Sequence, residues 1–236
     1  MTRRLYLAGA GPGEVALDAA ARHYLARVLR LSAGDALEVF DGAGRAYEAV
    51  LGPEGASVTI GVERARPAGV DVTLLQGLPK GDKLELVLQK ATELGVARVW
   101  PVICERSVSR PDAERRESRA ARWRKVAEEA ARQCGRADVP RVDAPSPLRD
   151  ALAEPRRDGE ARLVLDPRAN APLSAYGDAE RFTLLVGPEG GLSDAELELA
   201  RDAGFVGVTL GPRVLRTETV ALAALAVLAH LKGELG

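Results

Sequence analysis

The sequence predicts an α/β protein in two parts, a small β-barrel followed by a larger domain with a parallel sheet. Three observations support this fold class. Short alternating segments with a tight turn precede residue 67, as is typical of a small β domain. After that point apolar runs alternate with helical patterns, which is typical of a parallel sheet covered by helices. Near the end of the sequence, two glycine-bearing loops each follow an apolar run and open a helix.

The first part contains four expected strands and one helix. The segment Asp41–Gly44 has the composition of a hairpin turn between two of the strands. Asp18 is placed to cap the helix, and Leu25, Val28 and Leu29 form its apolar stripe. The strands are expected over Arg3–Leu7, Ala36–Asp41, Arg45–Leu51 and Val58–Arg64.

In the second part the alternation of strands and helices predicts a parallel sheet with helices on both faces. The first helix begins at Asp82, which stands in capping-box spacing with Glu85. A long helix is expected over Glu114–Gln133, and Pro140–Pro155 is the least regular stretch. The strands are expected over Val72–Leu75, Val99–Cys104, Leu163–Leu165, Phe182–Val186 and Val206–Leu210.

The composition is that of a globular protein that folds without disulfides or metal ions. Of the 236 residues 46% are hydrophobic, which is enough for a sizeable core. Cys104 and Cys134 have no cysteine or histidine at ligand spacing, which argues against a zinc site and a disulfide framework. No apolar run is long enough to span a membrane, and no signal-peptide core is present. We therefore expect a cytoplasmic protein with no metal ion and no membrane partner.

The net charge of −1 conceals a basic region between Cys104 and Arg141. That region holds eleven basic residues, ten of them arginine, against seven acidic ones. Arginine binds phosphate and stacks on bases, so a nucleic-acid surface is one interpretation. The other is a solvated helix face with Glu–Arg pairs, and charge alone favours this second interpretation.

The first glycine-bearing loop is Gly187–Gly191. Its glycines permit positive φ angles and let the backbone lie against a ligand with its N–H groups exposed. Ser193 and Glu196 form a capping box, and Leu192 and Leu197 are placed to staple the start of the following helix. We therefore expect the loop to be fixed from its C-terminal side.

The second loop, Leu210–Thr219, leads into the apolar helix Val220–Leu231, with Thr217 as its expected N-cap. A single loop of this kind is more often a tight strand-to-helix connection than a ligand site, but two in tandem favour a ligand. Neither loop has the phosphate-binding pattern of nucleoside triphosphatases, and no acidic residue is spaced for a dinucleotide ribose. The pattern therefore argues against nucleoside triphosphates and NAD.

The two loops resemble the C-terminal signature of the SPOUT methyltransferases, and more narrowly the enzymes that methylate N3 of uracil in small-subunit ribosomal RNA. The matching segments are Leu185–Gly191 and Leu210–Val220. Seven further segments are similar to internal motifs of that family: His23–Leu25 with Val28–Arg30, Gly34–Asp35, Pro79–Asp82, Gln89–Gly95, Glu105–Ser107 and Glu129–Arg136. The resemblance covers nearly the whole chain.

This resemblance implies a PUA-like β-barrel that binds RNA over residues 1–68 and a SPOUT α/β domain over residues 69–236, with a deep trefoil knot in about residues 160–236. It implies a homodimer, S-adenosylmethionine as cofactor, and 16S ribosomal RNA within the small ribosomal subunit as partner. The residues expected to hold the cofactor are Leu165, Gly187, Pro188, Glu189, Gly190, Gly191, Leu210, Gly211, Leu215, Arg216, Thr217 and Thr219.

Methylation of uracil N3 requires that its proton leave, so the site needs a proton acceptor or cations that stabilise the uracil anion. The catalytic candidates are Arg216, Glu218 and Arg136, and ordinary capping or ion pairing is the alternative for each. The residues expected to contact RNA are Arg4, His23, Arg30, Lys80, Arg106, Gln133 and Arg136. Two alternatives stay open for the whole protein: another SPOUT RNA methyltransferase, or a non-catalytic RNA-binding assembly factor.

Overall fold

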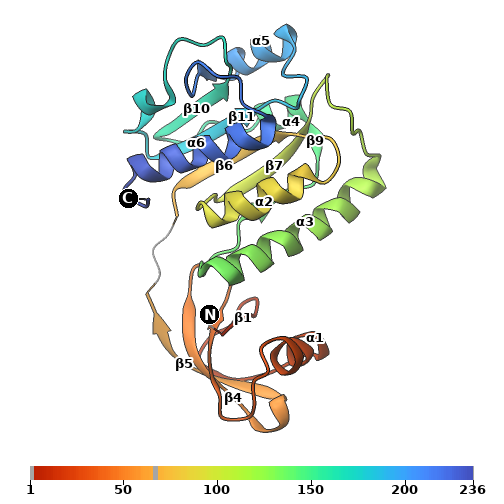
Figure 1. The fold of residues 1–236 in the computed structure, drawn as a ribbon, viewed down its shortest axis with the longest axis vertical. Helices are drawn as coiled ribbons and strands as arrows, with labels where there is room; N and C mark the ends of the chain where they lie inside the picture. Colours follow the sequence, from red (N-terminus) through yellow and green to blue (C-terminus); the bar gives the residue numbers. More distant parts are fainter. Residues whose placement is uncertain (1–2, 66–68, 236) are drawn as a thin grey trace. The chain divides into compact units, whose positions relative to one another are not determined.

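A computed structural model describes residues 3–65 and 69–235 of the chain, which divides into two compact units. Unit 1 comprises Met1–Ala68 with Glu128–Val139, and unit 2 comprises Gly69–Ala127 with Pro140–Gly236. Each unit contains a sheet of its own (Figure 1). Glu128–Val139 therefore packs with the first unit, although the chain on either side of it belongs to the second.

Unit 1 is built on five strands: β1 (Arg4–Tyr6), β2 (Gly13–Ala16), β3 (Ala36–Phe40), β4 (Ala46–Leu51) and β5 (Ser57–Arg64). Their order is β1-β3-β4-β5-β2, with β1 and β3 parallel and the other pairs antiparallel. The hairpin between β3 and β4 is confirmed, since the Asp41 carboxylate accepts hydrogen bonds from the N–H groups of Ala43 and Arg45. The strand that sequence patterning did not reveal is β2.

The helical segment of unit 1 is α1 (Ala19–His23), which continues into a π-helical turn over Tyr24–Val28. The Asp18 side chain accepts a hydrogen bond from the Ala21 N–H, as the sequence predicts. Val28 is wrong as a member of the apolar stripe, because its side chain is 62% exposed. A π-helical turn rotates by a smaller angle per residue than an α-helix. Val28 therefore points away from the face of the helix on which Leu25 is buried.

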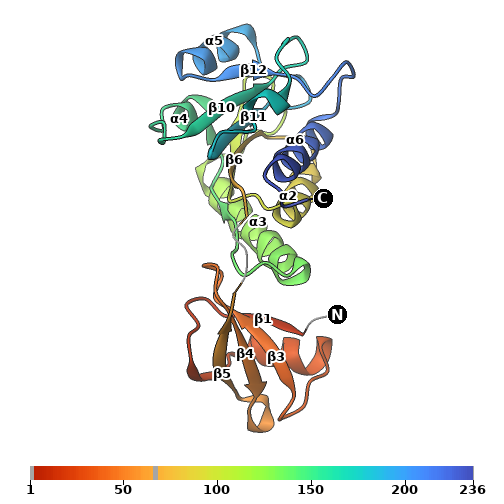
Figure 2. The ribbon, with the colours of Figure 1, turned by 90° about the vertical axis from the view of Figure 1, so that its left-hand side faces the viewer.

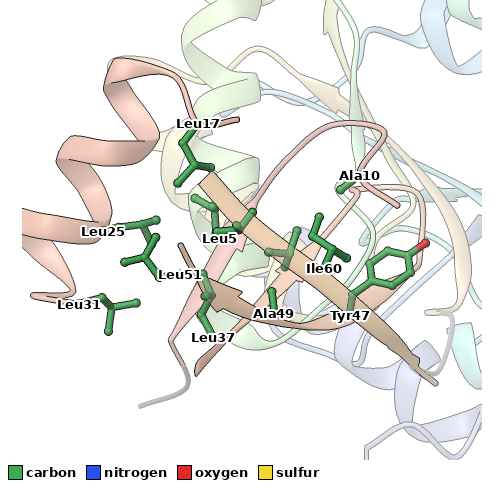
Figure 3. Close-up of a cluster of buried hydrophobic side chains, with 12 residues drawn as sticks. Leu5, Ala10, Leu17, Leu25, Leu31, Leu37, Tyr47, Ala49, Leu51 and Ile60 are labelled. Atoms are coloured by element: carbon green, nitrogen blue, oxygen red, sulfur yellow. The ribbon is translucent and has the colours of Figure 1, made fainter. Parts of the chain in front are cut away.

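The core of unit 1 lies between this helical segment and the sheet. Leu25 and Leu31 come from the helical side, and Leu37, Tyr47 and Ile60 come from the strands. Figure 3 shows Leu25 and Leu31 beside the strands that carry the other core residues. A 3₁₀ turn over Pro53–Gly55 joins β4 to β5.

Arg4 is a structural residue of unit 1, and the expectation that it contacts RNA is wrong. Only 2% of Arg4 is exposed. Its Nε donates to Glu38 at 2.6 Å, and its Nη1 donates to the carbonyl oxygens of Ala131 at 2.9 Å and Arg132 at 3.1 Å. Its Nη2 donates to the carbonyl oxygen of Arg136 at 2.8 Å. The guanidinium therefore provides hydrogen-bond donors for carbonyl groups at the end of a helix. No sequence pattern indicates that this helix end lies beside β1.

Unit 2 is built on seven strands: β6 (Asp71–Gly77), β7 (Arg98–Ile103), β8 (Arg141–Val142), β9 (Ser146–Pro147), β10 (Glu160–Leu165), β11 (Arg181–Val186) and β12 (Val206–Val208). The order is β12-β10-β11-β6-β7-β8, and β9 also pairs with β7. Every pair is parallel. The predicted parallel sheet is confirmed.

The remaining helices are α2 (Lys83–Glu93), α3 (Ala113–Cys134), α4 (Leu148–Leu152), α5 (Asp194–Asp202) and α6 (Thr217–Leu231), and Leu173–Tyr176 forms a 3₁₀ turn. Figure 2 shows α2 and α6 on one face of the sheet and α4 and α5 on the other. Because both faces are covered, the central strands are mostly apolar, and Leu74 and Leu184 are fully buried.

Two expectations for residues 82–155 of unit 2 are wrong. Asp82 precedes α2, but its side chain makes no capping hydrogen bond. Glu85 instead forms an ion pair with Arg122 at 2.7 Å, so it is not available to complete a capping box. The stretch Pro140–Pro155 is also more regular than expected, since it contains β8, β9 and α4.

Most of the arginines along α3 that the structure describes in unit 2 bind groups of the same unit. Arg124 pairs with Glu117 at 2.6 Å, and Arg119 donates to the Ser109 hydroxyl at 2.7 Å. Together with the pair between Arg122 and Glu85, these contacts favour the interpretation of this region as a solvated, ion-paired helix face.

The two cysteines are expected to differ in reactivity. Burial raises the pKa of the Cys104 thiol to about 12, and the nearby Glu196 carboxylate adds to the shift. Cys134 is exposed. Because the thiolate is the reactive form, a thiol reagent at pH 8 should modify Cys134 rapidly and Cys104 only after unfolding. Peptide mapping of the native and urea-unfolded protein checks this, and rapid modification of Cys104 in the native protein would contradict it.

Candidate functional site

A cavity of about 630 Å³ opens at the carboxyl ends of three neighbouring strands of unit 2. Leu165 ends β10, Val186 ends β11 and Val208 ends β12, and all three residues line the cavity. Open parallel sheets bind ligands at this edge, in cavities of roughly 300–1,000 Å³. The two glycine-bearing loops follow β11 and β12, so the fold brings both of them to one cavity.

The first loop, Gly187–Gly191, lies directly against the end of β6. A Cβ atom at Gly77 would stand 2.5 Å from the nitrogen of Pro188 and 2.8 Å from the carbonyl carbon of Gly187. Real Cβ atoms do not approach other atoms so closely. The sheet therefore sets the position of the loop through a backbone contact that only glycine permits.

The same loop is fixed at its other end as the sequence predicts. The Ser193 hydroxyl accepts a hydrogen bond from the Glu196 N–H at 3.3 Å, and Glu196 accepts one from the Ser193 N–H at 2.9 Å. The expected capping box is confirmed. Arg106, which follows β7, donates to the carbonyl oxygen of Gly190 at 3.0 Å and adds a third point of attachment.

A lysine between two carboxylates links this loop to both α2 and α6. Lys83 Nζ lies 2.9 Å from Glu189 and 3.5 Å from Glu218. Its hydrogen bond to Glu189 raises the pKa of Lys83. Burial alone would raise the pKa of Glu189, but hydrogen bonds from Lys83 and from the backbone hold that pKa below its usual range. Both groups are therefore charged at neutral pH, and Lys83 is a cation that the sequence interpretation missed.

A second charged cluster lies at the end of β10. Asp166 lines the cavity, and Arg168 binds it at 3.1 Å and Asp194 at 3.4 Å. Burial opposes ionisation of Asp166, but the hydrogen bonds from Arg168 lower its pKa overall. The cavity therefore has an anionic group at the end of β10.

Thr217 connects the two loops, although not as the expected helix cap. The N-cap residue of α6 is Arg216, which makes no side-chain capping bond, and Thr217 is the first helical residue. The Thr217 hydroxyl donates to the carbonyl oxygen of Gly187 at 2.6 Å. It also accepts a hydrogen bond from Gln76 Nε2 at 2.9 Å. A threonine at this position therefore joins the start of α6 to the first loop.

Most of the residues expected to hold a cofactor meet at this cavity. Those that line it are Leu165, Gly187, Pro188, Glu189, Gly191, Leu210, Leu215, Arg216 and Thr217. Three expected residues do not line it. Gly190 faces Arg106, with a Cβ position 2.9 Å from the Arg106 Cβ atom. Gly211 and Thr219 are exposed outside the lining.

The catalytic and RNA-binding candidates are divided between the two units. In unit 2, Arg216 and Arg106 line the cavity, Glu218 has a side chain that is 13% exposed, and Lys80 is exposed. The candidates of unit 1 other than Arg4 are His23, Arg30, Gln133 and Arg136. The first three of these are exposed, whereas Arg136 is half-buried and pairs with Asp138.

Two arginines at the cavity are available to bind an anion. Arg213 and Arg216 are both exposed and both line the cavity. Among the residues that the structure describes, neither has a carboxylate partner within ion-pair distance, whereas Lys83 and Arg168 at the same cavity do. The second loop therefore offers two guanidinium groups to a ligand that carries or develops negative charge.

The sequence interpretation missed Lys83, Asp166, Arg213 and the buried Gln76. Arg213 lies inside the predicted second loop, but the sequence does not show that its side chain is exposed at the cavity. Asp166 follows a predicted strand directly, which is the usual place of a binding residue in a parallel sheet. Lys83 and Gln76 flank the end of β6, and no local pattern indicates that this end meets the two loops.

Comparison with known families identifies both parts of the chain. A family model described as an RNA methyltransferase domain matches residues 66–229, and one described as an RNA methyltransferase PUA domain matches residues 17–61. No group of metal-binding side chains occurs among residues 3–65 and 69–235. Over the same residues, every helix is too short or too polar to cross a membrane.

Curated relatives and solved structures agree with the family models. The chain is 36% identical to a ribosomal RNA small subunit methyltransferase E of Synechocystis over 222 residues, which cover 90% of this chain and 71% of the relative. A protein of the same name from Mycobacterium bovis is 37% identical over 215 residues, covering 86% and 80%. A crystal structure of this enzyme from Neisseria gonorrhoeae, bound to S-adenosyl methionine, is 33% identical with a TM-score of 0.90 and covers 98% of both chains. A Legionella pneumophila methyltransferase in complex with the same cofactor is 32% identical, with a TM-score of 0.89 and 98% coverage of both chains.

Proposed function

The chain belongs to the ribosomal RNA small subunit methyltransferase E family, and from that premise we propose that it transfers the methyl group of S-adenosylmethionine to N3 of a uracil in 16S ribosomal RNA. The observation that carries the proposal is the cavity at the ends of β10, β11 and β12, which is lined by two glycine-bearing loops. The second loop presents Arg213 and Arg216 there, and neither has a carboxylate partner within residues 3–65 and 69–235. This arrangement combines a pocket for a small cofactor with cations for an anionic substrate.

The cavity suits S-adenosylmethionine in shape and in chemistry. Leu165, Leu210 and Leu215 supply apolar walls for the adenine ring, and the backbone of Gly187–Gly191 supplies hydrogen-bonding groups without side chains in the way. Asp166 lies at the same cavity as a carboxylate for the cationic end of the cofactor. When bound, S-adenosylmethionine supplies an electrophilic methyl group on a sulfonium. We propose that segment 160–236 holds it in a trefoil knot, as the family resemblance implies.

Among the protein's own residues, Arg216 is proposed to stabilise the uracil anion by binding the oxygen atoms of the uracil ring. The uracil N3 proton must leave before or during transfer, so negative charge develops on the ring. A guanidinium with no carboxylate partner can meet that charge without first breaking an ion pair. Glu218 is the proposed proton acceptor, and one oxygen of its carboxylate lies 3.5 Å from Lys83 Nζ.

We propose that RNA is bound by residues of both units. Exposed polar and basic side chains are available on unit 1 at His23, Arg30 and Gln133, and on unit 2 at Lys80 and Arg106. Arg136, which pairs with Asp138, is also proposed to contact RNA. The substrate is proposed to be 16S ribosomal RNA within the small ribosomal subunit, in the cytoplasm.

We also propose a homodimer formed across α6. Leu222, Ala223, Ala226 and Val227 are apolar and only half-buried within the chain. A helix with apolar residues on so many faces is stabilised by a further packing partner. A second copy of the chain would supply that partner and would lie beside the second loop.

Arg216→Ala is expected to slow methyl transfer by about 100-fold while leaving the affinity for S-adenosylmethionine nearly unchanged, because the lost charge acts on the uracil anion. Single-turnover transfer of labelled methyl groups to unmodified small subunits measures the rate, and calorimetry measures the affinity. Arg149→Ala, at an exposed position of α4 outside the cavity lining, is the control. An Arg216→Ala variant that methylates at the unaltered rate would remove Arg216 from the mechanism.

A further inference from the structure

Gln76, near the end of β6, is a buried glutamine whose side chain is linked to the two glycine-bearing loops through one residue, Thr217. Gln76 is completely buried, with an exposed fraction of 0%. Its Nε2 donates to the Thr217 hydroxyl at 2.9 Å and to the carbonyl oxygen of Gly77 at 3.1 Å. The Thr217 hydroxyl in turn donates to the carbonyl oxygen of Gly187 at 2.6 Å. Three segments that are far apart in the sequence are thus connected by one chain of hydrogen bonds.

The direction of each bond in this chain follows from the inventory of donors. Thr217 has one hydroxyl proton, and the carbonyl oxygen of Gly187 can only accept, so that proton lies between them. The hydroxyl must then accept from Gln76, which requires that the Gln76 amide present its NH₂ group to Thr217. The NH₂ group also donates to the carbonyl oxygen of Gly77, which fixes the same orientation independently.

This orientation leaves Gln76 Oε1 buried without a hydrogen-bond donor among the residues that the structure describes. A buried acceptor without a donor destabilises the fold, and a leucine of similar size would avoid that cost. A residue chosen for stability alone would therefore be apolar here. The amide is explained by what its NH₂ group does to Thr217.

We propose that Gln76 is a positioning residue for the cofactor site and acts through Thr217. By donating to the hydroxyl, Gln76 prevents Thr217 from turning its proton elsewhere and keeps it on the carbonyl oxygen of Gly187. The first loop and the start of α6 are then held in one relative position at the cavity wall. This inference rests on the proposed binding of S-adenosylmethionine to that cavity.

The test is a double-mutant cycle on cofactor affinity with the full-length protein. Gln76→Leu should weaken S-adenosylmethionine binding by roughly threefold to tenfold, the range that follows from the net value of one hydrogen bond. Thr217→Val should weaken binding at least as much. In the Thr217→Val background, adding Gln76→Leu should change the affinity very little, because the residue through which Gln76 acts is already lost.

Stability provides the second readout. The urea midpoint of cofactor-free Gln76→Leu should stay close to that of the unaltered protein, because the substitution also removes the unpartnered Oε1 atom. Gln76→Glu keeps the size of the side chain but replaces the donor with an acceptor, and it should also weaken binding. It serves as the second variant in case Gln76→Leu fails to fold. Thr92→Val is the control for losing a buried threonine hydroxyl, since that hydroxyl donates to Leu88 within α2.

Three outcomes would overturn the inference: unchanged affinity in both Gln76 variants, equal losses in the presence and absence of Thr217, or a loss of affinity fully explained by unfolding. In each of these cases the unaltered protein still binds S-adenosylmethionine, so the proposed function stands. If the unaltered protein does not bind it, the proposed function fails first.

Discussion

Replacing Gly77 with alanine is expected to weaken S-adenosylmethionine binding on the order of 100-fold, since displacements of about 1 Å at a binding site can have effects of that size. The new Cβ atom would stand 2.5 Å from the Pro188 nitrogen, 2.6 Å from Pro188 Cδ and 2.8 Å from the carbonyl carbon of Gly187. None of these atoms belongs to a flexible side chain. Because β6 is held between β7 and β11, the first loop must move instead.

Calorimetric titration of Gly77→Ala with S-adenosylmethionine checks this expectation. The matched control is Gly207→Ala, also on a strand of the sheet, whose Cβ atom would meet only the Ala169 Cβ at 3.4 Å, an ordinary contact. Gly207→Ala should bind the cofactor normally. If Gly77→Ala also bound it normally in a folded protein, the close approach of β6 to the first loop would not govern the site.

Replacing Arg4 with methionine is expected to lower the free energy of unfolding by about 3–5 kcal/mol, the range observed when one partner of a buried ion pair is removed. The substitution takes the guanidinium away from Glu38 and from carbonyl oxygens at the end of α3. Methionine fills much of the space, so the loss comes from polar groups that were satisfied by Arg4. Urea unfolding followed by circular dichroism measures the change.

The adjacent Arg3 is the control for this measurement. The Arg3 side chain is 51% exposed and lies 3.6 Å from Asp35, which is itself partly exposed. Arg3→Ala should lower the free energy of unfolding by less than about 1 kcal/mol, because exposed ion pairs contribute little. Equal effects of the two substitutions would contradict the structural role of Arg4.

Local patterns predicted the elements of this fold well where the determining contacts are themselves local. The capping box of Ser193 and Glu196 spans one helical turn, and both of its hydrogen bonds are present. The hairpin after β3 is set by Asp41 and its neighbours. The alternation of strand and helix likewise predicted the parallel sheet, since each unit of that pattern is a short segment.

Three of the expectations that failed depend on contacts between distant segments. Glu85 has capping-box spacing, but Arg122, far along the chain, forms an ion pair with it. Arg4 is of a residue type that often binds RNA, but the end of α3 covers it. Thr217 is of a residue type that often caps helices, but its hydroxyl donates a hydrogen bond to Gly187. In each case the residue type was informative and its partner was not visible from the sequence.

The proposed function was reached through the resemblance of two loops, and the sequence alone could place those loops but not the groups that support them. The apolar run before each loop indicated a strand end, where parallel sheets bind ligands. Gln76, Gly77 and Lys83 belong to the end of β6 and the start of α2, more than a hundred residues earlier in the chain. Only the order of strands in the sheet brings them to the cavity.

The most direct test of the proposed function is to incubate the purified protein and S-adenosylmethionine with small ribosomal subunits from a strain that lacks the modification, and to map methylated uridines in the 16S ribosomal RNA by mass spectrometry. We expect one new N3-methyluridine, which Arg216→Ala forms far more slowly. Methylation at a ribose 2′-hydroxyl would contradict the assigned target and indicate another RNA methyltransferase of this fold. Binding of the subunit without any methyl transfer would contradict the enzyme and indicate a non-catalytic assembly factor.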